Sequence, residues 1–216
     1  MGNHLLTLPP VPAPSLRELK KRTTSEVLAA AAYDLVREVG PDVTLDEIAG
    51  RAGYSRRTFA NHFACKQEAV VEGFFHRIGL ADPTADLAGD TPATSLAEVI
   101  DLAEGVVGRI LTPPALTEVR AFGEILARTE SLRPFLLDGI QRLRTTGRFA
   151  RLTDHLPQES LAFLFGATVG MVATVLERVM GCEPDAAPPT EPDLTEMSAL
   201  LTRAFDHLRH GFAEPA

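Results

Sequence analysis

The chain has 216 residues, and with 45% hydrophobic and 23% charged residues it is expected to fold around a core rather than to stay disordered. Its net charge of −8 argues at first sight against a nucleic-acid partner. The charge is unevenly divided, however: residues 1–78 carry ten Lys and Arg against nine Asp and Glu, which leaves −9 for residues 79–216. The N-terminal part is therefore permissive of DNA binding.

Cysteine usage and hydropathy exclude several further classes of protein. Cys65 and Cys182 lie far apart without a C-x-x-C pair, so neither a disulfide framework nor a zinc module is expected. The N-terminus lacks the basic and apolar regions of a signal peptide. The longest apolar run, from Leu161 to Leu176, has 16 residues, which is short for a membrane span. We expect a cytoplasmic protein without membrane association.

An arm and a long helix are predicted at the N-terminus. Residues 1–14 contain four prolines, which is typical of an extended or disordered arm. Helical spacing of apolar residues then runs from about Leu16 to Val39, and Gly40-Pro41 ends the helix. The stripe predicted to be buried comprises Leu28, Ala31, Ala32, Leu35, Val36 and Val39. Near the start of this helix, Lys20-Lys21-Arg22 is either a phosphate-binding or minor-groove arm or a solvated helix start.

Two short helices joined by a sharp turn follow. Thr44 and Glu47 have the T-x-x-E spacing of a capping box, which begins the first helix. Gly53 permits the turn, and Ser55 caps the second helix. Apolar residues fasten both helices to the core, namely Leu45, Ile48, Ala49 and Ala52 in the first and Phe59 and Phe63 in the second. The spacing of these features predicts a helix-turn-helix.

The second of these helices leaves cationic and hydrogen-bonding side chains on or near its open side: Arg56, Arg57, Thr58, Asn61 and His62. A short, firmly mounted helix with such side chains is the element that reads bases in the major groove of DNA. The alternative is a three-helix element used only for packing. The caps, the turn glycine, the phenylalanine anchors and the paired arginines together favour DNA binding.

The rest of the chain is predicted to be helical as well. A fourth helix starts at about Lys66, and a loop with Pro83, Gly89 and Pro92 follows it. Ser95 and Glu98 form another capping box. Helical patterns then cover about 95–111, 115–128, 132–148, 157–180 and 194–212, with a proline-rich linker at 181–193. Because no alternating strand pattern of useful length occurs, the fold class is all-α with about nine helices.

Residues 20–78 resemble the DNA-binding head of the TetR family of bacterial transcriptional regulators. The resemblance rests on Val39-Gly40, Thr44, Ile48-Ala49, the segment Ala52-Gly53-Tyr54-Ser55, Arg57-Thr58-Phe59, Asn61-His62-Phe63 and Lys66. It implies a homodimer whose heads enter successive major grooves of a double-stranded operator and whose helical bodies bind a small effector that releases the DNA. The implied division is a helix-turn-helix domain at 15–65 and an effector-binding and dimerisation domain at 66–216.

The resemblance also assigns roles to single residues. It implies DNA-backbone contacts by Thr44, Tyr54, Ser55, His62 and Lys66, and base or backbone contacts by Arg56, Arg57 and Thr58. Ala60 stands where the family usually has an aromatic side chain that touches a phosphate. We expect Arg57 to offset that loss, because a guanidinium binds phosphate or the O6/N7 edge of guanine. Cys65 stands where a serine commonly caps the fourth helix, and a thiol is a poor cap.

The body offers weaker signals for an effector and for dimerisation. Aromatic residues either line an effector pocket or form plain core, and a few polar groups would converge on such a pocket. The predicted pocket comprises Phe74, Phe75, Arg120, Phe122, Glu124, Phe135, Phe163 and Thr168. The Gly166-x-x-x-Gly170 spacing marks a closely packed helix, and the resemblance implies that the last two helices pair with their copies. The predicted dimer interface comprises Gly166, Gly170, Met197, Leu201, Phe205 and Leu208.

Signatures of catalysis and of cofactors do not occur in the sequence. Glycine loops that hold phosphates, nucleophile elbows and H-E-x-x-H motifs are missing, so we expect neither an enzyme nor a cofactor. His207 and His210 are more typical of a solvated or dimer-edge position than of a metal site, and a redox role for Cys65 would need a partner thiol. We predict a ligand-responsive repressor with a small apolar or amphipathic effector. The alternative is an all-α small-molecule or partner-binding protein with weakened DNA binding.

Overall fold

A computed structural model describes residues 15–81, 93–145, 153, 156–180 and 191–210. The described part is all-α, as predicted, with nine α-helices and one 3-10 helix. The helices are α1 Leu16–Val39, α2 Leu45–Arg51, α3 Arg56–Ala60, α4 Lys66–Arg77, α5 Leu96–Ile110, α6 Pro113–Arg128, η1 Glu130–Leu132, α7 Arg133–Thr145, α9 Gln158–Met180 and α10 Glu191–His210. The predicted arm at 1–14, the interhelical loop with Pro83, and most of the linker, with Cys182, lie outside the described residues.

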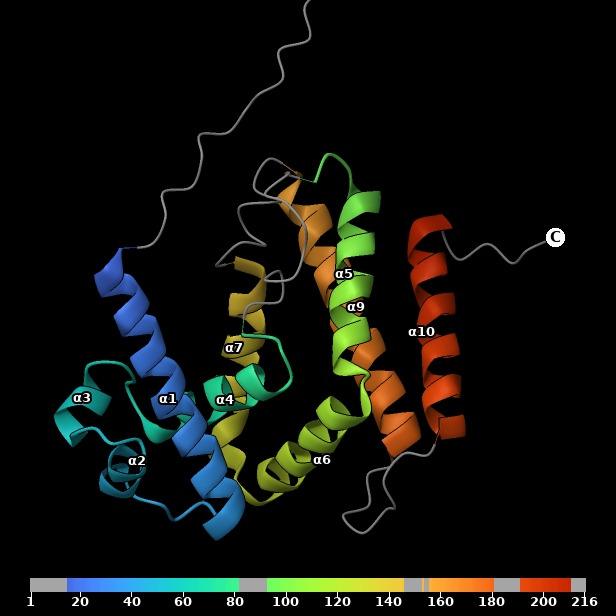
Figure 1. Cartoon of the computed structure of the whole chain (residues 1–216). Helices are drawn as coiled ribbons and strands as arrows, with labels where there is room; N and C mark the ends of the chain where they lie inside the picture. The colour runs from blue at the N-terminus through green and yellow to red at the C-terminus, as the bar shows by residue number, and fades with distance from the viewer. Residues whose placement is uncertain (1–14, 82–92, 146–152, 154–155, 181–190, 211–216) are drawn as a thin grey trace, which may run out of the picture.

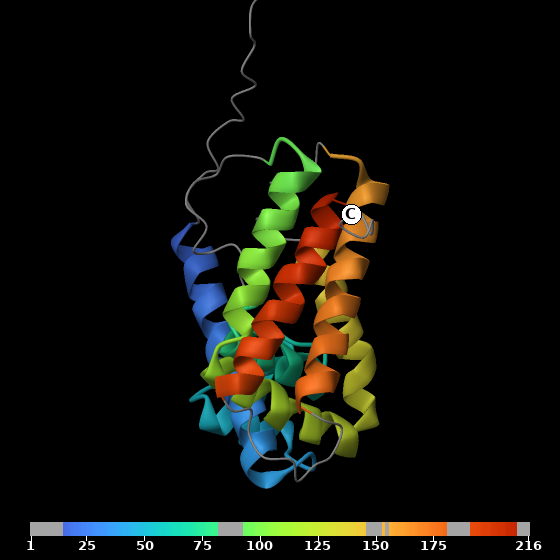
Figure 2. The ribbon, with the colours of Figure 1, turned by 90° about the vertical axis from the view of Figure 1, so that its right-hand side faces the viewer.

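The helices form two groups, which Figure 1 shows side by side. We call residues 15–81, with α1 to α4, the head, and residues 93–210 the body. In Figure 2 the helices α5, α10 and α9 stand next to one another on the side of the body that faces away from α3. The two groups share one core, because residues of α6 and η1 pack in the same buried cluster as α1 and α4.

The first helix has the predicted bounds, and the residues that cap it explain where it begins and ends. Ser15 begins α1 with a full capping box, in which the Ser15 backbone donates to Glu18 and the Ser15 hydroxyl accepts from the Glu18 amide. The helix ends at Gly40, whose φ of 109° favours glycine. The buried stripe differs slightly from the prediction: Val39 is 74% exposed, whereas Ala29 and Tyr33 are fully buried.

Close packing of α4 against α1 organises the head. A Cβ on Gly73 would lie 2.2 Å from the Ala29 carbonyl oxygen, so the absence of a side chain lets the two backbones meet. The adjacent Phe74 ring stacks on Phe122 of α6 at 4.0 Å, and Tyr33 packs at 6.2 Å from Phe74. This aromatic cluster joins α1 and α4 to α6 of the body.

The body has a second core, between its last two helices and α5. Met197, Leu201 and Phe205 of α10 are 0%, 3% and 0% exposed and pack with Val175 of α9. These three residues were predicted at the dimer interface; within the protomer, α5 and α9 cover this face of α10. Leu208 is half-buried against the same cluster.

Two helix starts differ from the predicted ones. A helix was predicted from about residue 115, but α6 begins two residues earlier, and Pro113 and Pro114 both lie in its first turn. Proline is tolerated there because the first amides of a helix have no intrahelical acceptor. The last helix, α10, begins at Glu191 instead of near Leu194.

The helix α9 is apolar but little covered. Its segment Gln158–Glu177 is long and apolar enough to cross a membrane by length and composition, and 11% of it is buried. The fold therefore leaves most of one apolar helix at the surface of the protomer.

Candidate DNA-binding site

The pair α2 and α3 forms the predicted helix-turn-helix. The Thr44 amide donates to the Glu47 carboxylate at 2.8 Å, and the Glu47 amide donates to the Thr44 hydroxyl at 3.3 Å, which completes the capping box. The hydrogen bond from the Thr44 backbone is the main reason that the pKa of Glu47 lies below its ordinary value. Gly53 makes the turn with a φ of 74°.

The recognition helix α3 is held at both ends, as the sequence predicts. The Ser55 hydroxyl accepts from the Thr58 amide at 3.1 Å and caps the N-terminus. Phe59 and Phe63 are 1% and 6% exposed, and their rings lie 5.5 Å apart in the head core. A helix of only five residues therefore has a fixed orientation, because its cap and its two aromatic anchors restrain it.

The two arginines at the start of α3 differ in their surroundings. Arg56 makes an ion pair with Asp46 of α2 at 3.1 Å. Arg57 is exposed, and its side chain has no hydrogen bond or ion pair within the described part of the chain. The Thr58 hydroxyl lies 2.9 Å from the Ser55 hydroxyl, and Asn61 is exposed at the end of the helix. Of these two arginines, Arg57 can bind a new anion without breaking an existing ion pair.

Three further predicted DNA contacts are partly engaged within the protein. Lys66 donates to the Val43 carbonyl oxygen at 2.7 Å and to the Pro41 carbonyl oxygen, so its ammonium group fastens the α1–α2 loop to α4. His62 is half-buried, with Nδ1 enclosed. Tyr54 is 37% exposed, and its hydroxyl lies 3.5 Å from that of Thr24 in α1. The turn before α3 therefore lies against the N-terminal half of α1.

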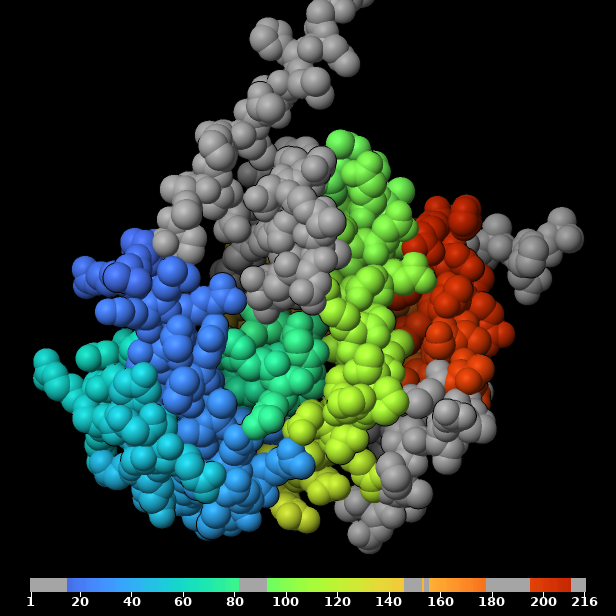
Figure 3. Space-filling model, viewed as in Figure 1, coloured from blue at the N-terminus to red at the C-terminus, as the bar shows by residue number. Residues whose placement is uncertain are grey.

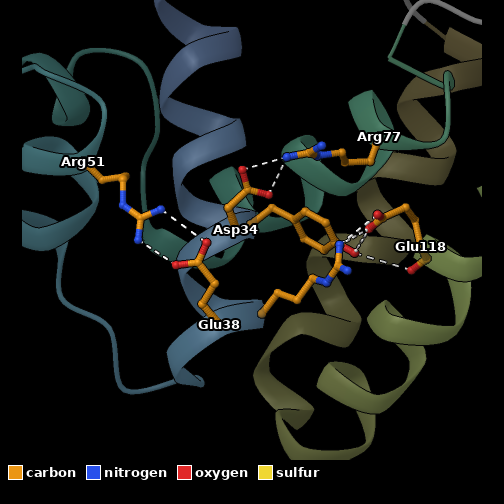
Figure 4. A network of polar contacts seen from close by, with 7 residues as sticks. Asp34, Glu38, Arg51, Arg77 and Glu118 are labelled. Atoms are coloured by element: carbon orange, nitrogen blue, oxygen red, sulfur yellow. Dashed lines mark hydrogen bonds and ion pairs between the residues drawn. The ribbon is translucent and has the colours of Figure 1, made fainter.

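Ion pairs on successive turns of α1 connect the site to the rest of the fold (Figure 4). Asp34 accepts two hydrogen bonds from Arg77 at the end of α4, at 2.6 and 2.7 Å. One turn later, Glu38 accepts from Arg51 at the end of α2, at 2.6 Å. The pair with Arg51 is the main reason that the pKa of Glu38 is lowered. Through these pairs α1 fixes α2 relative to α4.

The same helix is also tied to the body by Glu118 of α6. The Tyr33 hydroxyl donates to the Glu118 carboxylate at 2.8 Å, and Arg37 donates to both of its oxygens at 2.8 and 3.0 Å. Burial, and then the contact with Glu118, raise the pKa of Tyr33. Sequence reasoning missed this link, because the 85 positions between Tyr33 and Glu118 leave no local spacing to read.

A small apolar cavity lies in the body between α5, α7 and α9. Its volume is about 80 Å³, and it is lined by Val99, Ala103, Val106, Val107, Leu143, Leu161, Leu164, Phe165 and Thr168. Of these residues Thr168 alone has a polar side chain, and its hydroxyl donates to the Leu164 carbonyl oxygen of its own helix at 2.9 Å. The cavity therefore offers a ligand apolar contacts and hardly any free polar group.

Most of the predicted effector-pocket residues lie elsewhere. Phe74, Phe75 and Phe122 are buried core residues, Phe135 packs against the same core, and Phe163 is 80% exposed. Arg120 pairs with Glu124 along α6 at 3.8 Å, away from the cavity lining. Thr168 is the predicted residue that does line the cavity. The others were chosen by residue type, which does not tell whether an aromatic ring faces a void or a packed neighbour.

A metal site is not indicated by the described residues, in which groups of three or more potential ligands do not occur. The predicted glycines Gly166 and Gly170 are both exposed on α9, and a Cβ added to either would meet no atom of another element within 4 Å. Cys65 begins α4 without a side-chain cap, as expected for a thiol, and is half-buried.

Comparison with known protein families agrees with the helix-turn-helix geometry. Residues 28–72 match the model of the family described as bacterial regulatory proteins, tetR family. The curated proteins contain no match to the chain. A TetR-family transcriptional regulator from Mesorhizobium loti MAFF303099 is 16% identical over 87% of this chain and 95% of its own, with a TM-score of 0.48. A gamma-butyrolactone receptor (ArpA like protein) is 16% identical over 87% of this chain and 99% of its own, with a TM-score of 0.32.

Proposed function

Since the chain belongs to the TetR family of bacterial regulators, we propose that it is a ligand-responsive repressor that acts as a homodimer on a DNA operator. The observation that carries the proposal is the mounting of α3, whose cap and buried phenylalanines hold a free arginine on an exposed edge. Affinity would come largely from phosphate contacts, so binding should weaken steeply as salt rises.

Arg57 gives the direct test of this proposal. Arg57→Ala is expected to weaken binding to a duplex from upstream of the chain's own gene by roughly 5- to 150-fold, because a guanidinium contact to guanine or phosphate contributes about 1–3 kcal/mol. Arg133→Ala is the matched control, since Arg133 is an exposed arginine on α7 in the body. Anisotropy titrations measure both affinities, and circular dichroism verifies the fold.

Two results would count against the proposal. If the wild-type dimer does not bind the upstream duplex even at low salt, the alternative of a binding protein with weakened DNA affinity gains support. If the wild type binds but Arg57→Ala and Arg133→Ala bind equally well, then Arg57 does not replace the aromatic contact that Ala60 lacks.

The cavity between α5, α7 and α9 is proposed as the effector site. Its lining favours an uncharged, apolar ligand or the apolar end of an amphipathic one, because the Thr168 hydroxyl is already bonded. A cavity of about 80 Å³ holds a small group and must widen for a larger effector. Mass spectrometry of ligand that co-purifies with the protein tests this assignment, and a strongly charged ligand would contradict it.

The exposed face of α9 is proposed as the dimer contact. Phe163 is 80% exposed there, and small residues continue the face along the helix: Gly166, Ala167, Gly170 and Ala173. A second copy would cover apolar surface that the protomer leaves open, and the glycines would let the two helices approach closely. Of the residues predicted from the sequence, Gly166 and Gly170 remain in this proposal.

A further inference from the structure

The N-terminal end of α1 extends beyond the head core. Residues 15–23 are all exposed, whereas burial begins at Leu28 and continues along the helix. Eight consecutive exposed residues at the start of a helix, 16–23, are unusual, because a helix in a folded protein gains most of its stability from packing. In Figure 3 these first turns and α3 lie on the same side of the molecule.

Three cations share one face of this exposed segment. Arg17, Lys20 and Lys21 are exposed, and their side chains have no hydrogen bond or ion pair within the described part of the chain. Their spacing of three and four residues puts them on one face of the helix, and Thr24 continues that face by one turn. Arg22 lies on another face and pairs with Glu26 at 2.8 Å.

Thr24 shows which way this basic face points. Its hydroxyl lies 3.5 Å from that of Tyr54, in the turn directly before the recognition helix α3. The basic face is therefore continuous with the exposed surface of the helix-turn-helix. Glu18, which lies between Arg17 and Lys20 in the sequence, is held in the capping box with Ser15 and makes no ion pair with these cations in the described part of the chain.

We propose that Arg17, Lys20 and Lys21 form a basic arm that binds the DNA phosphate backbone beside the groove entered by α3. The inference rests on the proposed function, because it assumes that the head faces a duplex. DNA carries one negative charge per about 1.7 Å of its axis, so a row of cations along a helix meets several phosphates. The arm adds affinity that is independent of base sequence, and the bases are read by α3.

The test uses the dependence of DNA affinity on salt. The variant R17Q/K20Q/K21Q is expected to lower the slope of log affinity against log salt by about 0.9 for each phosphate that the arm no longer neutralises, or about 2.7 per protomer. The single variant Lys21→Gln is expected to lower the slope by about 0.9. Its control is Arg22→Gln, which removes a cation from another face of the same helix and should leave the slope unchanged. Each variant is titrated with the upstream duplex and with a duplex of random sequence.

The outcomes separate the arm from the proposed function. If the variants keep their helix content and bind DNA with the same salt slope as the wild type, the proposed arm is overturned and the repressor proposal stands. If the upstream duplex binds no better than the random one, the repressor proposal fails, and the arm is still tested by the slope on random DNA.

Leu16 and Leu19, 69% and 46% exposed, lie beside the cations. If the triple variant loses binding to phosphatidylserine vesicles and keeps the wild-type DNA slope, the surface serves a membrane, which also overturns the arm.

Discussion

The glycine packed in the head core and the glycines on α5 and α9 of the body have opposite surroundings. In the head, Gly73 of α4 lies so close to α1 that a Cβ would be 2.2 Å from the Ala29 carbonyl oxygen. In the body, a Cβ on Gly105, Gly166 or Gly170 would meet no atom within 4 Å. Gly139 of α7 belongs with the first kind, because a Cβ there would lie 2.4 Å from the Phe75 ring of α4. The head helices have already closed their contacts inside one protomer, whereas the body retains open helix faces and a cavity. This difference is the structural basis of the two proposals that the body binds a ligand and a second copy.

The largest effect is expected at Gly73. Gly73→Ala forces backbone atoms of α1 and α4 apart and is expected to destabilise the protein by about 3 kcal/mol, as overpacking of a core does. Gly105→Ala makes the same change on an exposed position of α5 and is expected to stabilise the protein by roughly 0.5–1 kcal/mol. Urea unfolding followed by circular dichroism measures both, and equal effects at the two sites would refute the contrast between head and body.

The next effect concerns the open face of α9. Phe163→Glu is expected to raise the dimer dissociation constant at least about 100-fold, because burying a carboxylate in an apolar contact is unfavourable by several kcal/mol. Leu137→Glu is the matched control, since Leu137 is 64% exposed on α7. Sedimentation measures the dimer. Dissociation by Leu137→Glu instead of Phe163→Glu would place the interface on the other side of the body.

A smaller effect is expected at the link between head and body. Tyr33→Phe removes the 2.8 Å hydrogen bond to Glu118 and is expected to destabilise the protein by about 1–2 kcal/mol. The Arg37–Glu118 pair remains in this variant, and its side chains are 43% and 17% exposed. A double-mutant cycle of Tyr33→Phe with Glu118→Gln, measured by urea unfolding, should show strong coupling. Additive effects would mean that the hydroxyl and the carboxylate act independently.

The features that the sequence predicted correctly are all local. The Thr44–Glu47 box, the Gly53 turn, the Ser55 cap and the Phe59 anchor depend on neighbours a few positions away. These short-range signals fix secondary structure, and in the head they fix most of the helix-turn-helix. The predicted DNA, effector and dimer contacts depend in addition on which side of each helix is already covered.

The features that were missed depend on contacts between distant segments. Lys66 was predicted to contact DNA, but it also binds two carbonyl oxygens of the α1–α2 loop, 23 and 25 positions away. The helical spacing of Phe205 is the same whether its ring packs on a second copy or within its own protomer. In the structure the ring is buried within the protomer. Periodicity shows that a face is apolar, whereas the fold determines what covers it.

The smallest effect tests whether the helix caps of head and body respond alike to acid. The pKa values of Glu47 in α2 and Glu98 in α5 are both lowered from 4.5, chiefly by hydrogen bonds from the backbones of Thr44 and Thr94. A lowered folded-state pKa contributes stability that is complete above the unfolded value and is lost as pH falls through the folded one. Wild type should therefore lose stability below about pH 4.5, and Glu47→Gln or Glu98→Gln should lose less over the same range.

Thermal unfolding at about pH 6 and about pH 3.5 measures this loss, and hydrogen exchange locates it. Glu47→Gln should increase exchange at the first amides of α2 and leave α5 protected, and Glu98→Gln should do the reverse. The body packs more openly than the head, so loss of its cap should remain confined to the end of α5. In the head, Ile48 of α2 and Phe59 of α3 lie in the same buried core, so loss of the α2 cap should spread to α3. If both variants disturb only their own helix, the head is less cooperative than this shared core implies.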